Sequence, residues 1–397
     1  MEQTCLQIHN DYLIPGGETK SVHLIGKVLE ENGYHVIRYY KNNKNIPVQT
    51  IQKILTGFKS LYNTNTIKEL EEIISHNDIS FAIIHNISPL ISNSVYDVLH
   101  KHHIPIIKYI QNYNLLCLNG ALDHGKHCKR CKINLFEGVK CKCYKNSLLY
   151  SIQKYIQKKI FDKKYKDNIN AYIAISNFVK QKHIEYGIPS KLIHTIYHFI
   201  DNPYNIEDKF DYNKFNIRQR YVLYMGRLSQ EKGILTLLQT FKSLPDFNLK
   251  IMGTGDLKNK LQEYVNKEKL NNISFLGFCS GETKSNLISQ AYALIVPSEW
   301  DEPFGRIVIE AYQYGTPVIV TDRGGLPELV NDGITGYIYK CKDCNDLRNK
   351  ILTLMNLDLQ SYHKLRQECI KMTENNFTST FYIRNINRVI NSITTIN

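Results

Sequence analysis

Short apolar runs alternate with amphipathic stretches along most of this chain. Residues 104–110, 221–225 and 293–296 have the length and the continuous apolar character of strands buried on both faces. Between such runs, apolar residues recur at helical spacing, as at residues 67–75. Strands that alternate with helices predict a parallel sheet covered by helices, the α/β class. Further strands are predicted at residues 4–9, 35–40, 79–85, 171–175, 193–196 and 248–252.

The alternation stops once and then restarts, which predicts two domains. Residues 201–220 are polar, contain Pro203 and fit a linker, and the strand at residues 221–225 begins a second series. A chain of 397 residues with 43% hydrophobic residues can bury two cores. We therefore expect one domain over residues 1–200 and a second over residues 201–379.

The most informative stretch covers residues 298–336 and follows the predicted strand at residues 293–296. A loop with prolines and a glycine leads into an apolar-periodic helix at residues 307–314. Glu302 lies in that loop and Glu310 lies about two helical turns later. Both carboxylates can therefore face the same side above the strand ends, where parallel sheets bind ligands.

Two kinds of group would meet a ligand at this place. Carboxylates accept hydrogen bonds from sugar hydroxyls, as the acidic residue of a dinucleotide site does from a ribose. The backbone amides of residues 304–306 lie at the predicted helix start, where unpaired N–H groups favour a phosphate or a sugar oxygen. The alternative is two solvated glutamates without a shared ligand.

A second motif follows the strand at residues 221–225. Gly226 and Arg227 begin a loop at the carboxyl end of this strand, and Lys232 lies five residues beyond the arginine. Arginine binds phosphate oxygens in a fork and lysine supplies a compact charge, so the pair suits a diphosphate. Gly253 ends the next strand, but the glycine-rich sequence there lacks the third glycine of a dinucleotide fingerprint, which argues against NAD or FAD.

Together these motifs resemble the retaining glycosyltransferases of family four, which have the GT-B fold. The resemblance extends more weakly over nearly the whole chain and is carried by Glu302-Pro303-Phe304-Gly305 with Glu310, by Gly315-Thr316-Pro317-Val318 and by Gly324-Gly325-x-Pro327-Glu328. It implies two Rossmann-like, doubly wound domains that face a cleft, with the activated sugar on the second domain and the acceptor on the first. It also implies that a last helix, within residues 380–397, returns to the first domain.

The resemblance assigns roles to individual residues. Arg227 and Lys232 would contact the donor pyrophosphate and Glu302 the donor sugar, so these three are the catalytic candidates. Glu310 would contact the ribose. The other donor-binding candidates are Gly16, Gly17, Gly226, Gly253, Phe278, Pro303, Phe304, Gly305 and Arg306. From the residues alone, Gly16-Gly17 suits a tight turn as well as a phosphate-binding loop.

His85 and Gln111 each follow a predicted strand of the first domain and are further candidates. The resembling family usually has histidine where this chain has Gln111, near the reacting carbon of the donor. Glutamine donates a hydrogen bond but carries no proton, so an acid, base or cationic role is not expected at this position. His85 is the nearest alternative, although a histidine at a strand end is at least as often structural.

Five cysteines form a cluster within residues 117–143. A reducing cytoplasm favours metal binding over disulfides, and Cys128 and Cys131 have zinc-knuckle spacing. With Cys117 and Cys143 they would complete a tetrahedral, structural zinc site, and nearby lysines and arginine would offset the thiolate charge. Free thiols are the alternative. No cofactor is expected to be required for catalysis.

The positive charge is concentrated in one segment. Residues 121–182 hold 15 Lys and Arg against 4 Asp and Glu, which is +11 of the formal +13. Within it, residues 149–166 form a basic amphipathic helix, which either packs its apolar face on the core or contacts anionic lipid headgroups. No nucleic-acid-binding motif accompanies the charge. Without a signal-like start or a run of about 20 apolar residues, we expect a cytoplasmic protein, peripheral at the inner membrane face in the second case.

The sequence therefore predicts a retaining, metal-independent glycosyltransferase of capsule or lipopolysaccharide type. Its donor would be a nucleoside-diphosphate sugar and its acceptor a glycan or a polyprenyl-linked glycan, with an anionic membrane surface as a further partner and no nucleic acid. Gln111 motivates one alternative, a non-catalytic partner that binds nucleotide sugar or glycan. A nucleotide-sugar epimerase of the same fold is another.

Overall fold

The computed structural model describes residues 3–13, 16–45, 59–122, 128–200 and 220–394. The chain divides into two compact units. The first contains residues 1–197 and 382–397, and the second contains residues 198–381. Nearly all of the predicted linker, residues 201–220, lies outside the described residues. Each unit is described by itself below.

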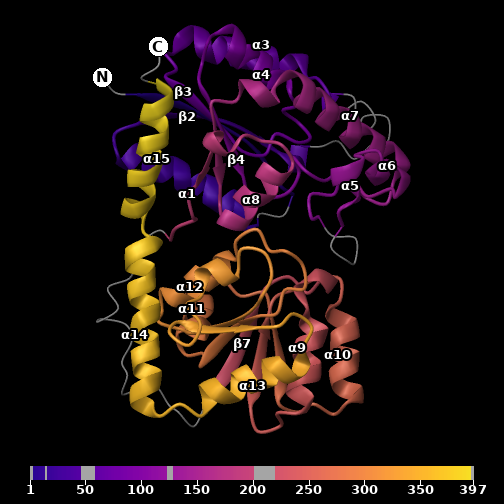
Figure 1. The fold of residues 1–397 in the computed structure, drawn as a ribbon, viewed down its shortest axis with the longest axis vertical. Helices are drawn as coiled ribbons and strands as arrows, with labels where there is room; N and C mark the ends of the chain where they lie inside the picture. The colour runs from indigo at the N-terminus through magenta and orange to yellow at the C-terminus, as the bar shows by residue number, and fades with distance from the viewer. Residues whose placement is uncertain (1–2, 14–15, 46–58, 123–127, 201–219, 395–397) are drawn as a thin grey trace. The chain divides into compact units, whose positions relative to one another are not determined.

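The first unit is built on a six-stranded parallel sheet with strand order β2-β1-β3-β4-β5-β6 (Figure 1, indigo to magenta). Its strands are β1 (Thr4–Asp11), β2 (His35–Asn42), β3 (Phe81–Ile84), β4 (Ile106–Ile110), β5 (Ala171–Ala174) and β6 (Ile193–Thr195). Its helices are α1 (Gly17–Glu31), α3 (Thr64–His76), α4 (Ser94–Lys101), α5 (Arg130–Ile133), α6 (Glu137–Lys140), α7 (Leu148–Lys164) and α8 (Asn177–Glu185).

The second unit has its own six-stranded parallel sheet, in the order β12-β11-β10-β7-β8-β9. The strands are β7 (Tyr221–Met225), β8 (Asn248–Met252), β9 (Ile273–Gly277), β10 (Ala293–Val296), β11 (Val318–Thr321) and β12 (Gly336–Tyr339). The helices are α9 (Ile234–Lys242), α10 (Lys258–Lys267), α11 (Gly281–Ser289), α12 (Arg306–Tyr312), α13 (Cys344–Met355) and α14 (Leu359–Asn376). Counted from β7, this is the Rossmann order 3-2-1-4-5-6.

A final helix, α15 (Ser379–Thr394), completes the core of the first unit. Its buried residues recur at helical spacing and include Ile386, Val389 and Ile390. The Tyr382 hydroxyl lies 2.6 Å from the Tyr109 hydroxyl of β4. Tyr382, close to the end of the sequence, is thus hydrogen-bonded inside the core of the first unit.

In both sheets the strand order reverses beside the first strand, between β1 and β3 and between β7 and β10. Ligands of doubly wound sheets bind beyond the carboxyl ends of the strands at such a reversal. The predicted α/β class with two doubly wound parallel sheets is confirmed. Among the described residues, no helix is both long and apolar enough to cross a membrane.

Candidate active site

The strand reversal of the second unit brings two sequence motifs together. The loop after β7 carries Arg227 and Lys232, and the loop after β10 carries Glu302. Lys232 Nζ donates to Glu302 Oε2 over 2.7 Å, although the residues are 70 positions apart. Arg227 is largely exposed, and its guanidinium pairs with Glu231 at 3.0 Å. The basic residues and the carboxylate predicted to meet a donor therefore share one edge of the sheet.

The Glu302 carboxylate is held in its ionised form. Its Oε2 atom also accepts from Trp300 Nε1 at 2.8 Å and from Ser298 Oγ at 3.0 Å. Burial alone would raise the pKa of this carboxyl, but the charge of Lys232 and the three hydrogen bonds outweigh burial and lower the pKa. Glu302 can therefore accept a hydrogen bond from a ligand hydroxyl at neutral pH.

Two glycines allow the chain segments around this ion pair to approach closely. Gly233 has φ 65°, and a Cβ there would lie 1.9 Å from the Pro297 carbonyl oxygen. Gly324 has φ 62°, and a Cβ there would lie 2.2 Å from the Glu302 carbonyl oxygen. Only glycine fits both the left-handed backbone and the contact. The amide of Gly325 then donates to the same Glu302 oxygen at 2.7 Å.

Glu310 lies on α12 and has a separate set of partners. Lys284 of α11 donates to its Oε2 atom at 2.7 Å, and Arg306 Nε lies 3.3 Å from its Oε1 atom. Lys284 was not singled out from the sequence, because its position on another helix hides the pairing. The Phe304 side chain is buried against the rings of His198 and Phe377, so only its backbone can serve a ligand.

The ends of β7, β8 and β9 are joined by glycine contacts. Gly253 has φ 146°, and a Cβ there would lie 1.8 Å from the Gly226 carbonyl oxygen. The Gly253 amide donates to Gly277 at 2.7 Å. Phe278 follows directly and is 77% exposed. An exposed aromatic ring beside closely packed backbone is suited to stack on a flat group such as a nucleotide base.

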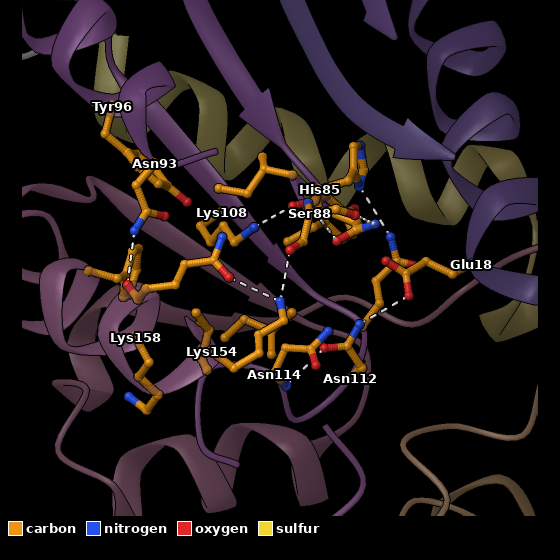
Figure 2. A pocket seen from close by; sticks show the side chains of 18 of the residues that line it. Glu18, His85, Ser88, Asn93, Tyr96, Lys108, Asn112, Asn114, Lys154 and Lys158 are labelled. Atoms are coloured by element: carbon orange, nitrogen blue, oxygen red, sulfur yellow. Dashed lines mark hydrogen bonds between the residues drawn. The ribbon is translucent and has the colours of Figure 1, made fainter. Parts of the chain in front are cut away.

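A pocket of about 750 Å³, open solvent at its mouth included, lies in the first unit (Figure 2). Its walls come from the ends of β3 and β4, the start of α1 and the inner side of α7. Most of its lining side chains are polar, and those labelled in Figure 2 are Glu18, His85, Ser88, Asn93, Tyr96, Lys108, Asn112, Asn114, Lys154 and Lys158. Among the lining residues, His85 and Gln111 are the two site candidates predicted from the sequence.

His85 is fixed by two glutamine side chains. Gln7 donates to the Val22 carbonyl oxygen and accepts from the Tyr40 hydroxyl, which orients its amide nitrogen toward His85 Nε2 at 3.2 Å. On the other side, Gln111 Nε2 lies 3.1 Å from His85 Nδ1. Gln111 Oε1 has no hydrogen-bond partner among the described residues. If the Gln111 amide group is rotated by half a turn, its Oε1 atom accepts a hydrogen bond from His85 Nδ1–H. Both atoms then have a hydrogen-bond partner.

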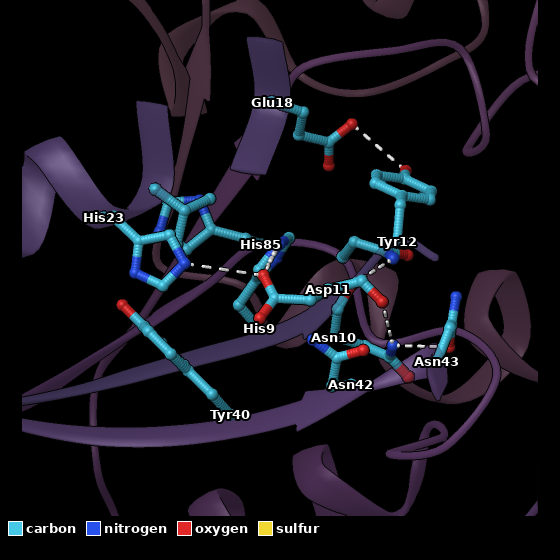
Figure 3. Close-up of polar contacts among 12 residues, drawn as sticks. His9, Asn10, Asp11, Tyr12, Glu18, His23, Tyr40, Asn42, Asn43 and His85 are labelled. Carbon is cyan, nitrogen blue, oxygen red and sulfur yellow. Dashed lines mark hydrogen bonds and ion pairs between the residues drawn. The ribbon is translucent and has the colours of Figure 1, made fainter. Parts of the chain in front are cut away.

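Other polar groups gather where β1 ends (Figure 3). Asp11 Oδ1 lies 3.3 Å from His9 Nε2 and 3.6 Å from His23 Nε2. Burial lowers the pKa of His9 to about 3, so its ring is neutral. Glu18, at the start of α1, accepts from Tyr12 and Asn112 at 3.1 Å each, and burial raises the pKa of its carboxyl.

Comparison with known proteins identifies the second unit. A family model described as glycosyl transferases group 1 matches residues 205–375. These residues therefore belong to a glycosyltransferase group 1 domain. An uncharacterized glycosyltransferase of Methanocaldococcus jannaschii is 27% identical over 86% of this chain and 85% of its own length. An uncharacterized protein from the cps region of Klebsiella pneumoniae is 28% identical over 87% of each chain.

Solved structures show that this glycosyltransferase has the GT-B fold. The crystal structure of a Rickettsia africae glycosyltransferase matches with a TM-score of 0.73 and 20% identity, covering 100% of both chains. An Anabaena protein in complex with UDP and glucose matches with a TM-score of 0.65 and 17% identity, covering 98% of this chain and 100% of its own. At these identities the likeness concerns the fold alone.

The predicted site residues of this glycosyltransferase fall into three groups. Lys232 and Glu302 are in direct contact, with Arg227 on the same loop as the lysine. Glu310 and Arg306 form a second contact on α12. Gly16 and Gly17 belong to the first unit, where Gly16 precedes α1 and has room for a Cβ. Their role toward the donor stays a prediction, as do the roles of Pro303 and Gly305.

The packing of the basic helix corrects one sequence-based interpretation. In the glycosyltransferase the helix runs Leu148–Lys164, and its apolar stripe faces outward rather than toward the core. Leu149 is 66% exposed and Ile152 and Ile156 are 36% and 38% exposed. The inner face is largely polar and comprises Ser151, Lys154, Gln157, Lys158 and Phe161. The spacing of the apolar residues locates one face of the helix, but it did not show whether that face packs on the core or faces outward.

The cysteine cluster of the glycosyltransferase lines one small pocket. Cys117, Cys128, Cys131, Cys141 and Cys143 are all free thiols around it. A hydrogen bond with Cys131 lowers the pKa of Cys117 to about 6. Thiolates are the ligands that zinc prefers. Within the part of the chain that the structure describes, however, no group of three or more His, Cys, Asp or Glu side chains is arranged to hold a metal ion.

Proposed function

We propose that this chain is a retaining glycosyltransferase that moves a sugar from a nucleoside-diphosphate sugar to a glycan or lipid-linked glycan in surface polysaccharide synthesis. The observation that carries the proposal is the contact of Lys232 with Glu302 at the strand reversal of the second unit. The cps-region relative supports the polysaccharide context. The Anabaena protein bound to UDP and glucose supports a nucleotide-sugar donor.

The reaction breaks the bond between the anomeric carbon and a diphosphate oxygen. Negative charge then grows on the diphosphate while the sugar gains oxocarbenium character. Arg227 and Lys232 stabilise the departing diphosphate, and Glu302 orients the sugar through its hydroxyls. Glu310 accepts from the ribose and Phe278 stacks on the base. Because two cations neutralise the leaving group, the proposal needs no catalytic metal.

The proton of the acceptor hydroxyl has a simple destination. Gln111 cannot take it, and His85 is buried between two glutamines. In the resembling family the leaving phosphate helps to accept this proton. The same route fits this chain, since an oxygen of the departing diphosphate becomes more basic as the bond to the sugar breaks.

The outer face of α7 supports peripheral binding to an anionic membrane on the cytoplasmic side. Leu149, Ile152 and Ile156 are exposed along one side of the helix, and Lys159 and Lys163 continue the same side toward its end. An apolar stripe followed by positive charge is typical of helices that lie in the headgroup region. A lipid-linked acceptor would be presented at that surface.

A product analysis tests the proposal. The purified protein is incubated with a panel of nucleoside-diphosphate sugars, with and without lipid-linked glycan acceptors. Acceptor-dependent release of nucleoside diphosphate with a new α- or β-linkage matching the donor supports retention. Interconversion of the donor sugar without release would indicate an epimerase. Donor binding without either change would indicate a non-catalytic partner.

Structural zinc in the cysteine cluster stays a prediction. The thiols suit zinc chemically, but the described side chains are not arranged as a group that could hold a metal ion. We expect about one zinc per chain by elemental analysis and a lower melting temperature after chelation, because bound metal contributes directly to folding. If the protein contains no metal and chelator does not change its melting temperature, the cysteines are free thiols.

A further inference from the structure

Two lysines of the first-unit pocket lie in contact with the same short loop. Lys108 of β4 donates to the His85 carbonyl oxygen, and Lys154 of α7 donates to the Ser88 hydroxyl at 2.8 Å. Figure 2 shows both ammonium groups approaching the segment after β3 from different elements. The two charges are therefore fixed in position by the fold and not carried on free surface side chains.

Neither of these lysines has a carboxylate partner within ion-pair distance in the described residues. Lys108 makes one hydrogen bond, and Lys154 makes a second to Gln157 Oε1 at 3.0 Å. An ammonium group has three donors, so two hydrogens on Lys108 and one on Lys154 remain for a ligand. Burial lowers the pKa of each to about 8, and the charge of Glu18 offsets this effect only in part for Lys108.

The remaining charges of the pocket are already matched. Lys158 pairs with Asp162 at 2.6 Å. Glu18 is the carboxylate among the lining residues. It accepts from the hydroxyl of Tyr12 and the amide of Asn112, and its charge also acts on Lys108 without a direct ion pair. Serine, asparagine, glutamine, histidine and tyrosine side chains supply the rest of the polar lining. The pocket thus combines an excess of positive charge with neutral hydrogen-bonding groups, a combination that suits an oxyanion next to sugar hydroxyls.

The number of unmatched donors indicates which oxyanion fits best. A carboxylate carries one charge and two oxygens, whereas a phosphate ester carries up to two charges and three free oxygens. Either anion can accept from two ammonium groups, but a phosphate can balance both charges whereas a carboxylate balances one. We propose that this pocket binds a phosphate group of the acceptor, held by Lys108 and Lys154, so that the acceptor is a phosphorylated or lipid-phosphate-linked sugar.

This inference rests on the proposed function only where it calls the ligand the acceptor of the transfer reaction. Phosphate binding itself is tested separately. Titration calorimetry of the full chain uses inorganic phosphate, glycerol 3-phosphate and farnesyl phosphate, with glucuronate and glycerol as carboxylate and neutral probes. We expect the phosphates to bind and the other two probes not to. Tighter binding of farnesyl phosphate would assign a lipid source, and equal binding a soluble one.

Variants assign the binding to the pocket. Lys154→Gln and Lys108→Gln should each weaken phosphate binding about tenfold or more, because each removes a charge-assisted contact. Lys154→Arg should largely restore it, and Lys159→Gln, on the exposed side of the same helix, should leave it unchanged. Lys108 belongs to a different element, so its variant reports even if Lys154→Gln fails to fold.

Three results would overturn the inference. They are preferential binding of glucuronate, absence of phosphate binding at millimolar concentration, and loss of that binding in Lys232→Gln equal to the loss in Lys154→Gln. The last would place the phosphate in the second unit. Hydrolysis of the donor without an acceptor, measured in parallel by release of nucleoside diphosphate, reports on the donor site of the proposed function. Release with no phosphate binding would therefore contradict this inference alone.

Discussion

Two lysines at the candidate site of the second unit and two in the pocket of the first unit have opposite kinds of partner. In the second unit, Lys232 and Lys284 each pair with a glutamate at 2.7 Å. In the first, Lys108 and Lys154 donate only to neutral oxygens. A paired lysine keeps its charge and positions its partner, whereas an unpaired buried lysine is costly unless a ligand compensates it. We therefore infer that preformed ion pairs of the second unit position a donor, whereas the pocket of the first unit binds an anion.

The largest effect is expected from Lys232→Gln. Transfer should fall about 100-fold or more, because a charge that stabilises the leaving group is removed. The variant should also lose about 1–3 kcal/mol of unfolding free energy, since Glu302 keeps its burial without its ion pair. Lys284→Gln is the matched control and should weaken donor binding more than it slows turnover. Near-normal turnover in Lys232→Gln would contradict the assignment of the leaving-group site.

The stability loss in Lys232→Gln should depend on pH in a defined direction. The pKa of Glu302 is lowered, so the native carboxylate contributes stability above the unfolded value near 4.5, which is lost as the pH falls through the native pKa. Without Lys232, burial dominates and the pKa of Glu302 rises. The difference between the two proteins in urea denaturation should therefore be small at acidic pH and grow toward neutrality.

A second test addresses how the ion pair is positioned. Gly324→Ala should reduce transfer more than tenfold and destabilise the protein, because its Cβ would lie 2.4 Å from the Glu302 amide nitrogen. Gly333→Ala is the control, since Gly333 also has positive φ but open space around its Cβ. The control should lose only about 1–2 kcal/mol from backbone strain. Equal losses of transfer in both would show that the contact at Gly324 is unimportant.

The unpaired lysines predict a smaller, alkaline effect on stability. Their pKa of about 8 in the native state lies below the unfolded value of 10.5, so the unfolded chain binds more protons between these values. Unfolding free energy should therefore contain a contribution that rises with pH from about 8 to 10.5. Denaturation of Lys154→Met across this range should show a smaller rise than the native protein. An identical rise would mean that Lys154 is not desolvated.

The smallest expected effect concerns the outer face of α7. Co-sedimentation with anionic but not neutral vesicles is expected at low salt, reduced by Lys159→Gln with Lys163→Gln, and separately by Ile152→Ser with Ile156→Ser. Each lysine near an anionic surface contributes about 1 kcal/mol before screening. Lys260→Gln with Lys267→Gln changes the net charge equally in the second unit and should have no effect. Equal binding to both vesicle types would exclude a charge-dependent surface.

Much of the fold could be predicted because its signals are local. The strands at residues 221–225 and 248–252 coincide with β7 and β8, since buried parallel strands are short apolar runs whatever their neighbours. The orientation of α7 could not be predicted in the same way. Its side toward the pocket carries Lys154 and Gln157, which donate hydrogen bonds to residues distant in sequence. Hydrophobic periodicity records none of these partners.

The candidate site residues likewise differ in whether a local sequence signal reveals them. Arg227, Lys232 and Glu302 lie in compact motifs, so their resemblance to a family pointed to them directly. The pocket of the first unit is assembled from single residues on α1, β4 and α7, with no recurring spacing. Lys108 lies in an apolar strand and Lys154 in a lysine-rich helix, where neither is conspicuous. Only the fold brings them to one loop.

The Tyr109 to Tyr382 contact also sets an order of assembly during synthesis. The sheet of the first unit is translated early, yet α15, which covers part of its core, is translated only after the entire second unit. At about 5–20 residues per second, the ribosome exposes this incomplete core for roughly 10–40 seconds. A nascent chain stalled within residues 198–381 should therefore bind chaperones through the first unit. A chain released before Tyr382 should unfold in the first unit more readily than in the second.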